Sequence, residues 1–111
     1  MSSGYNETDL SQEARHVHRA LASLQEELEA IDYYNQRIDR SEDADLKAIL
    51  AHNRNEEMEH ASMLFEWLRR NMPSFDTALK TYLFTSKPIT ELEAGAGNSS
   101  ASAASLGIGK L

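Results

Sequence analysis

The stretch Glu57-Met58-Glu59-His60 decides which fold this sequence can form. In an α-helix, Glu57 and His60 lie three positions apart and point in the same direction. A Glu-x-x-His helix that faces a single glutamate on another helix, here Glu27, makes half of a carboxylate-bridged di-metal site, and the complete site uses four helices. Because the chain has one such set, we expect two copies to meet and complete the site.

Two long helices are predicted around this motif. Apolar residues spaced alternately by three and four predict a first helix from about residue 10 to 39, with a capping pair at Asp9 and Gln12. Ser41-Glu42-Asp43 is typical of a turn and N-cap, so a second helix over about 43–71 runs antiparallel to the first. Asn35 takes the position at which this spacing would place a further apolar residue, and Glu27 lies directly beside the apolar seam of the first helix. The seam consists of Ala14, Val17, Leu21, Leu24, Leu28, Ile31 and Ile38.

The second helix has two stripes, which one neighbouring helix cannot cover together, so we expect contact with a further chain. After it, Pro73 breaks the helix and Ser74 is expected to cap a short third helix, which Lys87-Pro88 ends before one more turn at residues 89–93. The seam stripe is Leu46, Leu50, Asn53, Glu57, His60, Leu64 and Trp67, and the second stripe is Ala51, Met58, Ala61, Phe65 and Leu68.

The 111 residues predict one small domain at 10–94, after a disordered N-terminal segment at 1–9. Residues 95–105 are all Gly, Ala, Ser or Asn and predict a flexible linker. In the last segment, 106–111, apolar residues alternate, which suits an extended peptide bound in a partner's groove.

The net charge of −7 argues against nucleic-acid and anionic-membrane partners and suits a protein that attracts cations. The absence of cysteine excludes disulfides and iron–sulfur clusters. We find no signal peptide and no membrane span in the sequence, so a cytoplasmic location is expected.

Glu57 and His60 interrupt an apolar seam, and three interpretations account for them: exposure to solvent, a buried hydrogen-bond network, or metal binding. Charge favours metal, because a symmetric pair of chains brings together four carboxylates from Glu27 and Glu57, which two divalent cations would neutralise. Oxygen and imidazole ligands suit iron or manganese and tolerate zinc.

Other polar residues near this set have an ordinary structural interpretation beside a functional one. Tyr34, one heptad after Glu27, is a core aromatic or a hydrogen-bond donor close to the metals. The acidic residues Glu26 and Glu29 are a solvated face or a site that attracts incoming cations. His52 is expected to be a surface or interface histidine.

The chain also resembles the encapsulated ferritins, small ferritin-like proteins packed inside encapsulin shells. The similarity extends from about residue 12 to 94, and the ending from Ser105 to Gly109 is similar to a peptide that targets cargo to the shell wall. The matching segments are Glu26-Glu27-Leu28-Glu29-Ala30, Asp32, Tyr34, Ile49-Leu50-Ala51-His52-Asn53-Arg54, Glu56-Glu57, Glu59-His60, Trp67-Leu68-Arg69-Arg70-Asn71, Thr81-Tyr82-Leu83-Phe84-Thr85 and Pro88-Ile89-Thr90.

The resemblance implies an all-α fold: an antiparallel hairpin with a short third helix, which dimerises into a four-helix ferritin-like bundle and assembles as a ring decamer. It implies ferroxidase ligands at Glu27, Glu57 and His60 for two iron ions per dimer, with Tyr34 nearby. It implies an outer acidic site at Glu26 and Glu29, through which metal enters. Leu106, Gly107, Ile108 and Gly109 would dock on the encapsulin shell. Tyr33 departs from the tryptophan of the family pattern.

The function expected from residues and resemblance together is Fe(II) oxidation by O2, which feeds iron storage inside an encapsulin compartment in the cytoplasm. One rival is a di-iron peroxide or oxygen reductase of the rubrerythrin kind, although the chain has no cysteines for a rubredoxin-type electron donor. The other rival is a non-catalytic helical assembly module.

Overall fold

The computed structural model describes residues 7–93, and within that range the regular structure is helical. A 3-10 helix at Glu7–Asp9 is followed by α1 at Gln12–Arg40, α2 at Ala44–Asn71 and α3 at Pro73–Tyr82. The predicted fold class, an all-α hairpin with a short third helix, is confirmed. The chain divides into two units, residues 1–71 and 72–111, and each is described separately below.

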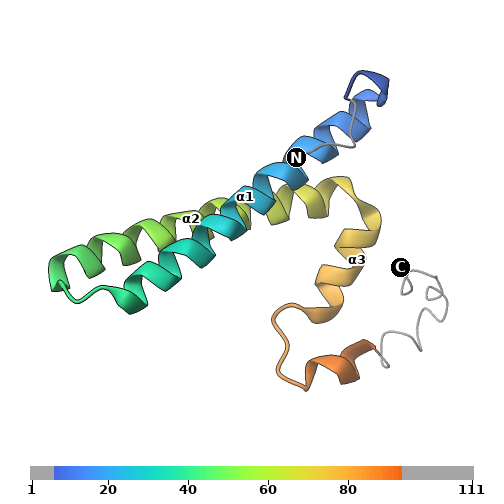
Figure 1. The fold of residues 1–111 in the computed structure, drawn as a ribbon. Coiled ribbons are helices and arrows are strands. Elements are labelled where there is room, and N and C mark those ends of the chain that lie inside the picture. The colour runs from blue at the N-terminus through green and yellow to red at the C-terminus, as the bar shows by residue number, and fades with distance from the viewer. Residues whose placement is uncertain (1–6, 94–111) are drawn as a thin grey trace. The chain divides into compact units, whose positions relative to one another are not determined.

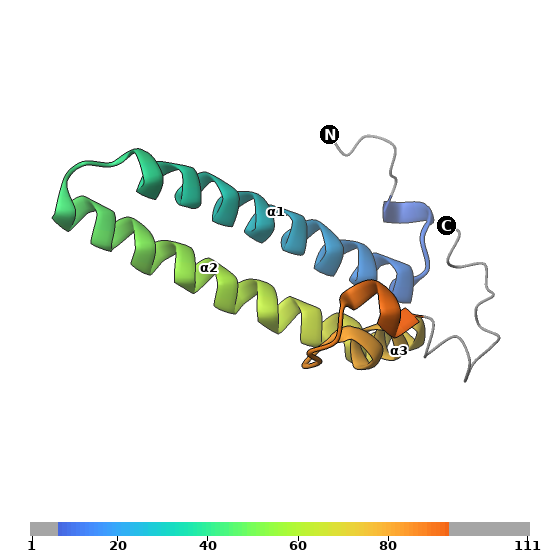
Figure 2. The same ribbon diagram turned by 90° about the horizontal axis from the view of Figure 1, so that it is seen from below.

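The first unit is an antiparallel hairpin, in which α1 and α2 lie side by side over most of their length (Figures 1 and 2). The backbone N–H of Ser41 closes α1 by donating to the carbonyls of Arg37 and Ile38. Asp43 caps α2, because its Oδ2 accepts from the backbone N–H of Leu46 at 2.8 Å. The predicted turn and cap at residues 41–43 are therefore confirmed, and the short loop keeps the two helices adjacent.

The beginning of α1 differs from the expected capping pair at Asp9 and Gln12. Ser11 is the N-cap, and its hydroxyl accepts from the backbone N–H of Ala14 at 3.1 Å. Glu7 lies in the 3-10 helix and pairs with the guanidinium of Arg19 at 2.9 Å. Residues 7–9, which were expected to belong to the disordered segment, form this 3-10 helix in the structure, and residues 1–6 lie outside the described range.

The core of the hairpin is small. The buried apolar side chains are Ala20 and Leu24 of α1, with Ala61 and Leu68 of α2, and of these Leu68 is fully buried. Leu21 and Leu28, both expected in the seam, are 39% and 46% exposed. The face of α1 that meets α2 is therefore turned by one residue, so Glu27 lies within the contact surface rather than beside it.

The second unit begins with α3, which corrects one predicted cap. Met72 is the N-cap and Pro73 is already the first helical residue, whereas Ser74 was expected to be the cap. Proline suits this place because its fixed φ is helical and its missing N–H has no intrahelical partner there. After α3, Phe84 adopts a left-handed φ of 59°.

Residues 89–93 form one more helical turn, as predicted, with the N–H of Glu91 bonded to the carbonyl of Pro88 at 3.0 Å. The predicted linker at 95–105 and peptide at 106–111 lie outside the described residues. Between residues 7 and 93, none of the helices combines the length and the apolar character needed to cross a bilayer.

Candidate metal centre

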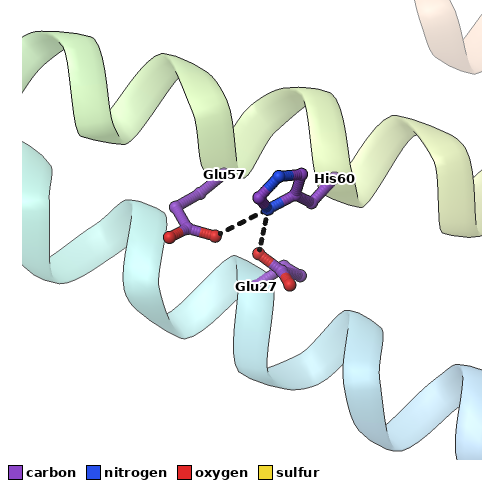
Figure 3. Close-up of side chains that lie close together, drawn as sticks. All are labelled: Glu27, Glu57 and His60. Carbon is purple, nitrogen blue, oxygen red and sulfur yellow. Dashed lines mark hydrogen bonds and ion pairs between the residues drawn. The ribbon is translucent and has the colours of Figure 1, made fainter.

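Three predicted ligands meet at the contact between α1 and α2 (Figure 3). Glu27 comes from α1, while Glu57 and His60 come from successive turns of α2 and point at it. The short loop aligns the two helices antiparallel and so brings residues thirty apart in sequence to the same level. Among the described residues, this is the cluster of metal-binding side chains that offers three ligands at once.

The distances in the cluster suit a shared cation. Nδ1 of His60 lies 3.3 Å from Oε1 of Glu57 and 3.5 Å from Oε1 of Glu27. One ligand atom from each of the three residues falls within 4.8 Å of the others. Since nitrogen and oxygen ligands lie about 2.0–2.2 Å from a metal such as zinc, small side-chain rotations would place all three around one ion.

The burial of Glu27 provides an independent test of whether a cation fits. Its Oε1 atom is buried and has no hydrogen-bond partner. The 3.5 Å contact to His60 is an ion-pair distance rather than a hydrogen bond. A buried carboxylate oxygen without a donor is destabilising, and a bound cation would satisfy it. The donor set, two carboxylates and an imidazole, fits iron or manganese.

The proton affinities of the three groups show how closely they interact. The pKa of Glu27 is raised, first by the interaction of its carboxyl group with the adjacent carboxyl group of Glu57 and then by partial removal from water. The same interaction, together with His60, lowers the pKa of Glu57. The pKa of His60 is raised, first by its hydrogen bond to Glu57 and further by the charge of Glu27. The three groups are therefore electrostatically linked, and a bound cation would compete with protons for the same atoms.

One side of the cluster is open. The His60 side chain is 47% exposed, compared with 24% for Glu27 and 25% for Glu57. The apolar neighbours Leu28 and Met58 are exposed as well. A single chain thus presents three ligands on a partly apolar surface without enclosing them.

The remaining predicted site residues do not join this cluster. Tyr34 is half-buried on α1, and the guanidinium of Arg37 lies 5.5 Å from the centre of its ring. Glu26 and Glu29 are exposed on α1. The predicted shell-docking residues Leu106, Gly107, Ile108 and Gly109 lie outside the described range.

Two polar contacts of the hairpin were not anticipated. The hydroxyl of Tyr33 donates to Oε2 of Glu29 at 3.0 Å, a contact that the spacing of four residues could have suggested. The Arg54 guanidinium donates to Oδ1 of Asn35 at 2.9 Å and joins α2 to α1. The only sequence signal for the second contact is that Asn35 takes an apolar place in the seam.

Comparisons with known proteins agree with this architecture. A family described as EncFtn-like matches residues 3–86. A ferritin-like protein of Thermotoga maritima is 53% identical over 114 aligned positions, which cover 100% of both chains. An encapsulated ferritin-like protein of Rhodospirillum rubrum is 52% identical, over 92% of this chain and 81% of the relative.

The fold has a similar solved structure. The crystal structure of a protein from Nitrosomonas europaea matches with a TM-score of 0.77 and 58% sequence identity, over 80% of this chain and 98% of that one. The family match covers most of the chain, including α1, α2 and all three residues of the cluster. The chain is therefore a member of the EncFtn-like family.

Proposed function

We propose that this protein is a ferroxidase, which oxidises Fe(II) to Fe(III) with O2 at a di-iron site shared by two chains. The observation that carries the proposal is the convergence of Glu27, Glu57 and His60, with a buried carboxylate oxygen that has no hydrogen-bond donor. In this reaction iron is the substrate, and the side chains of the cluster bind it.

A second copy of the chain would complete the site. Helix-bundle di-metal sites use one glutamate from each of two helices and a Glu-x-x-His pair from each of two others. The hairpin supplies one helix of each kind, with Glu27 on α1 and Glu57 and His60 on α2. Exposed Leu28 and Met58 beside the open side give a partner chain apolar surface to cover. Two hairpins related by twofold symmetry would form the four-helix bundle.

The ligand charges suit oxidation of the bound ions. Carboxylates from Glu27 and Glu57 stabilise Fe(III) more than Fe(II), because the attraction grows with the charge of the ion. His60 must lose a proton to bind the ion through the nitrogen that faces the carboxylates. Each Fe(II) gives up one electron, so two ions supply the two electrons that reduce O2, with two protons, to hydrogen peroxide. Tyr34, on the same helix as Glu27, is proposed as a hydrogen-bond donor near the site.

Iron would reach the site over the acidic face of α1. Glu26 and Glu29 are exposed there and carry negative charge close in sequence to Glu27. We propose them as an outer site that attracts Fe(II) before it reaches the ligands. The hydroxyl of Tyr33 already bonds to Glu29, so it would compete with an ion at that carboxylate.

The setting proposed for this chemistry is an encapsulin compartment in the cytoplasm, where the oxidised iron would be stored. The support comes from family membership and from the relative described as encapsulated. In the proposed arrangement the terminal peptide, with Leu106 and Ile108 as anchors, binds the shell wall, and the dimers form a ring decamer. A chain lacking residues 106–111 should still oxidise iron but should no longer co-purify with co-expressed encapsulin; continued co-purification would contradict the docking role.

The direct test is Fe(II) added without oxygen, followed by air, with Fe(III) absorbance measured near the ultraviolet edge. We expect rapid oxidation by the wild type and loss of most of it in His60→Ala and Glu57→Ala. The matched control is Glu59→Ala, an exposed glutamate on the same helix outside the cluster. Equal rates in all four proteins would favour the non-catalytic assembly module. Faster turnover with an added electron donor and peroxide than with Fe(II) would favour the peroxide reductase.

A further inference from the structure

Burial in the hairpin is uneven along its length. The buried residues Ala20 and Leu24 precede Glu27 on α1, and Ala61 and Leu68 follow His60 on α2. All of them lie on the side of the cluster away from the turn. Between residues 28 and 56, on the turn side, no side chain is fully buried. Packing therefore fixes the position of the two helices on one side of the cluster and fixes it less well on the other.

On the turn side, one polar contact joins the two helices. The guanidinium of Arg54 donates to Oδ1 of Asn35 at 2.9 Å. Within residues 28–56 it is the one side-chain hydrogen bond or ion pair that the structure shows between α1 and α2. Arg54 is half-buried and lies three residues before Glu57, so the contact is one helical turn from the cluster.

Asn35 interrupts the apolar pattern of α1 in the sequence, and in the structure its side chain is exposed while it bonds to Arg54 of the other helix. A hydrogen bond between two helices favours the one alignment that brings its donor and acceptor together, and so it specifies the register of the helices. In the observed alignment, Arg54 satisfies the Asn35 amide oxygen. Asn35, the residue that breaks the apolar pattern of α1, is therefore also the acceptor of the hydrogen bond between the two helices.

We infer that the Arg54–Asn35 hydrogen bond is a register lock, which holds Glu57 and His60 level with Glu27 for metal binding. This inference rests on the proposed function, and it makes Arg54 and Asn35 positioning residues rather than ligands. A slip of one turn would move α2 by about 5.4 Å along α1. That displacement exceeds a metal–ligand bond of about 2.0–2.2 Å, so the three ligands could no longer bind one ion.

The lock acts through geometry rather than through charge. The pKa of Glu57 is lowered by Glu27 and His60, and Arg54 is not among the causes. Arg54 also bonds to its neighbour Asn55 at 3.3 Å, within the same helix, and that bond cannot align the two helices. Asn55→Ala is therefore a matched control, because it removes a partner of Arg54 and leaves the interhelical contact in place.

The test uses Co(II) as the probe, with its visible absorption reporting both affinity and ligand geometry. Asn35→Leu and Arg54→Met should each weaken Co(II) binding about tenfold, as expected for loss of a hydrogen bond to a charged group. The double variant should be no weaker than either single variant, because both remove the same bond. Asn35→Asp should retain wild-type affinity, since its carboxylate accepts from Arg54, and Asn55→Ala should retain it as well.

Thermal unfolding without metal separates register from stability. Asn35→Leu should unfold at or above the wild-type temperature while binding Co(II) more weakly, a combination that a purely stabilising contact would not produce. Wild-type affinity in both Asn35→Leu and Arg54→Met would overturn the register lock and leave the ferroxidase proposal intact. Weaker binding in exact proportion to lost helix content would also overturn it. A wild-type protein that does not bind Co(II) would instead refute the metal site, and the lock with it.

Discussion

Oε1 of Glu27 lies 3.5 Å from Nδ1 of His60, although the two residues belong to different helices and are separated by the whole turn of the hairpin. The same nitrogen lies 3.3 Å from Glu57. The imidazole is therefore the point at which the two carboxylates meet. Any change that displaces it should alter the metal affinity, the proton affinity and the stability of the hairpin together.

Glu27→Gln should separate metal binding from folding. The raised pKa of Glu27 means that its charged form is disfavoured in the folded, metal-free protein, so replacing it with a neutral amide should leave metal-free stability unchanged or increased. The same change removes a ligand, so stabilisation by Co(II) should fall sharply. Thermal unfolding with and without Co(II) measures both effects. Glu59→Gln is the control, and an equal Co(II) effect in both variants would exclude Glu27 as a ligand.

Metal binding should weaken as the pH falls through the range of His60. Its pKa is raised above the usual value by Glu57 and Glu27, so the imidazole keeps its proton to a higher pH than a free histidine. Below that pKa, a cation must displace the proton, and affinity should fall about tenfold per pH unit. Co(II) titrations between pH 6 and 8 measure this slope. A flat profile would show that His60 is not a ligand.

The raised pKa of His60 also affects the stability of the metal-free protein, which should increase as the pH falls, whereas the metal affinity should decrease. The pKa of His60 is raised in the folded state, so the protonated imidazole contributes to the free energy of unfolding. This contribution is fully present below the pKa of the unfolded state, and it is lost as the pH rises through the pKa of the folded state. Wild type and His60→Gln should therefore converge in unfolding temperature above that pKa and differ below it. A constant difference across the range would contradict the assignment.

Leu28→Glu should test the role of the second chain. Leu28 is exposed beside Glu27 and makes no part of the ligand cluster, so a charge there leaves the ligands of one chain in place. If a partner covers this surface, the buried charge should prevent dimer formation and abolish Fe(II) oxidation. Gln12→Glu adds the same charge at an exposed polar position on the opposite side of α1 and serves as the control. Native mass measurement and oxidation rates provide the readout, and a dimeric, active Leu28→Glu would place the interface elsewhere.

Leu68→Ala should show how much the small apolar core contributes to the free energy of unfolding. Leu68 is fully buried, and truncation of such a leucine typically destabilises by about 2–5 kcal/mol. Leu46→Ala removes the same atoms from an exposed position of α2 and should have a much smaller effect. Chemical unfolding of the metal-free protein measures the difference. Similar losses in both variants would mean that Leu46 is buried in the assembled protein.

The sequence alone predicted the helices, the turn at residues 41–43 and the approach of Glu27 to Glu57 and His60. These features follow from local chemistry. The spacing of apolar residues predicts the helices, and Asp43 caps the second one. Because the loop is short, the second helix runs antiparallel to the first. Resemblance to a family added the expectation of iron chemistry, and the family itself is confirmed by the match over residues 3–86.

Only the tertiary structure decided how each helix is rotated about its axis. Neighbouring residues on a helix are about 100° apart, and a broad apolar stripe does not fix which of them faces the partner. Packing placed Ala20 and Glu27 against α2 and left Leu21 and Leu28 exposed. The missing donor at Glu27 Oε1 and the Arg54–Asn35 bond depend on that rotation, because both require side chains from two helices to meet at a defined register.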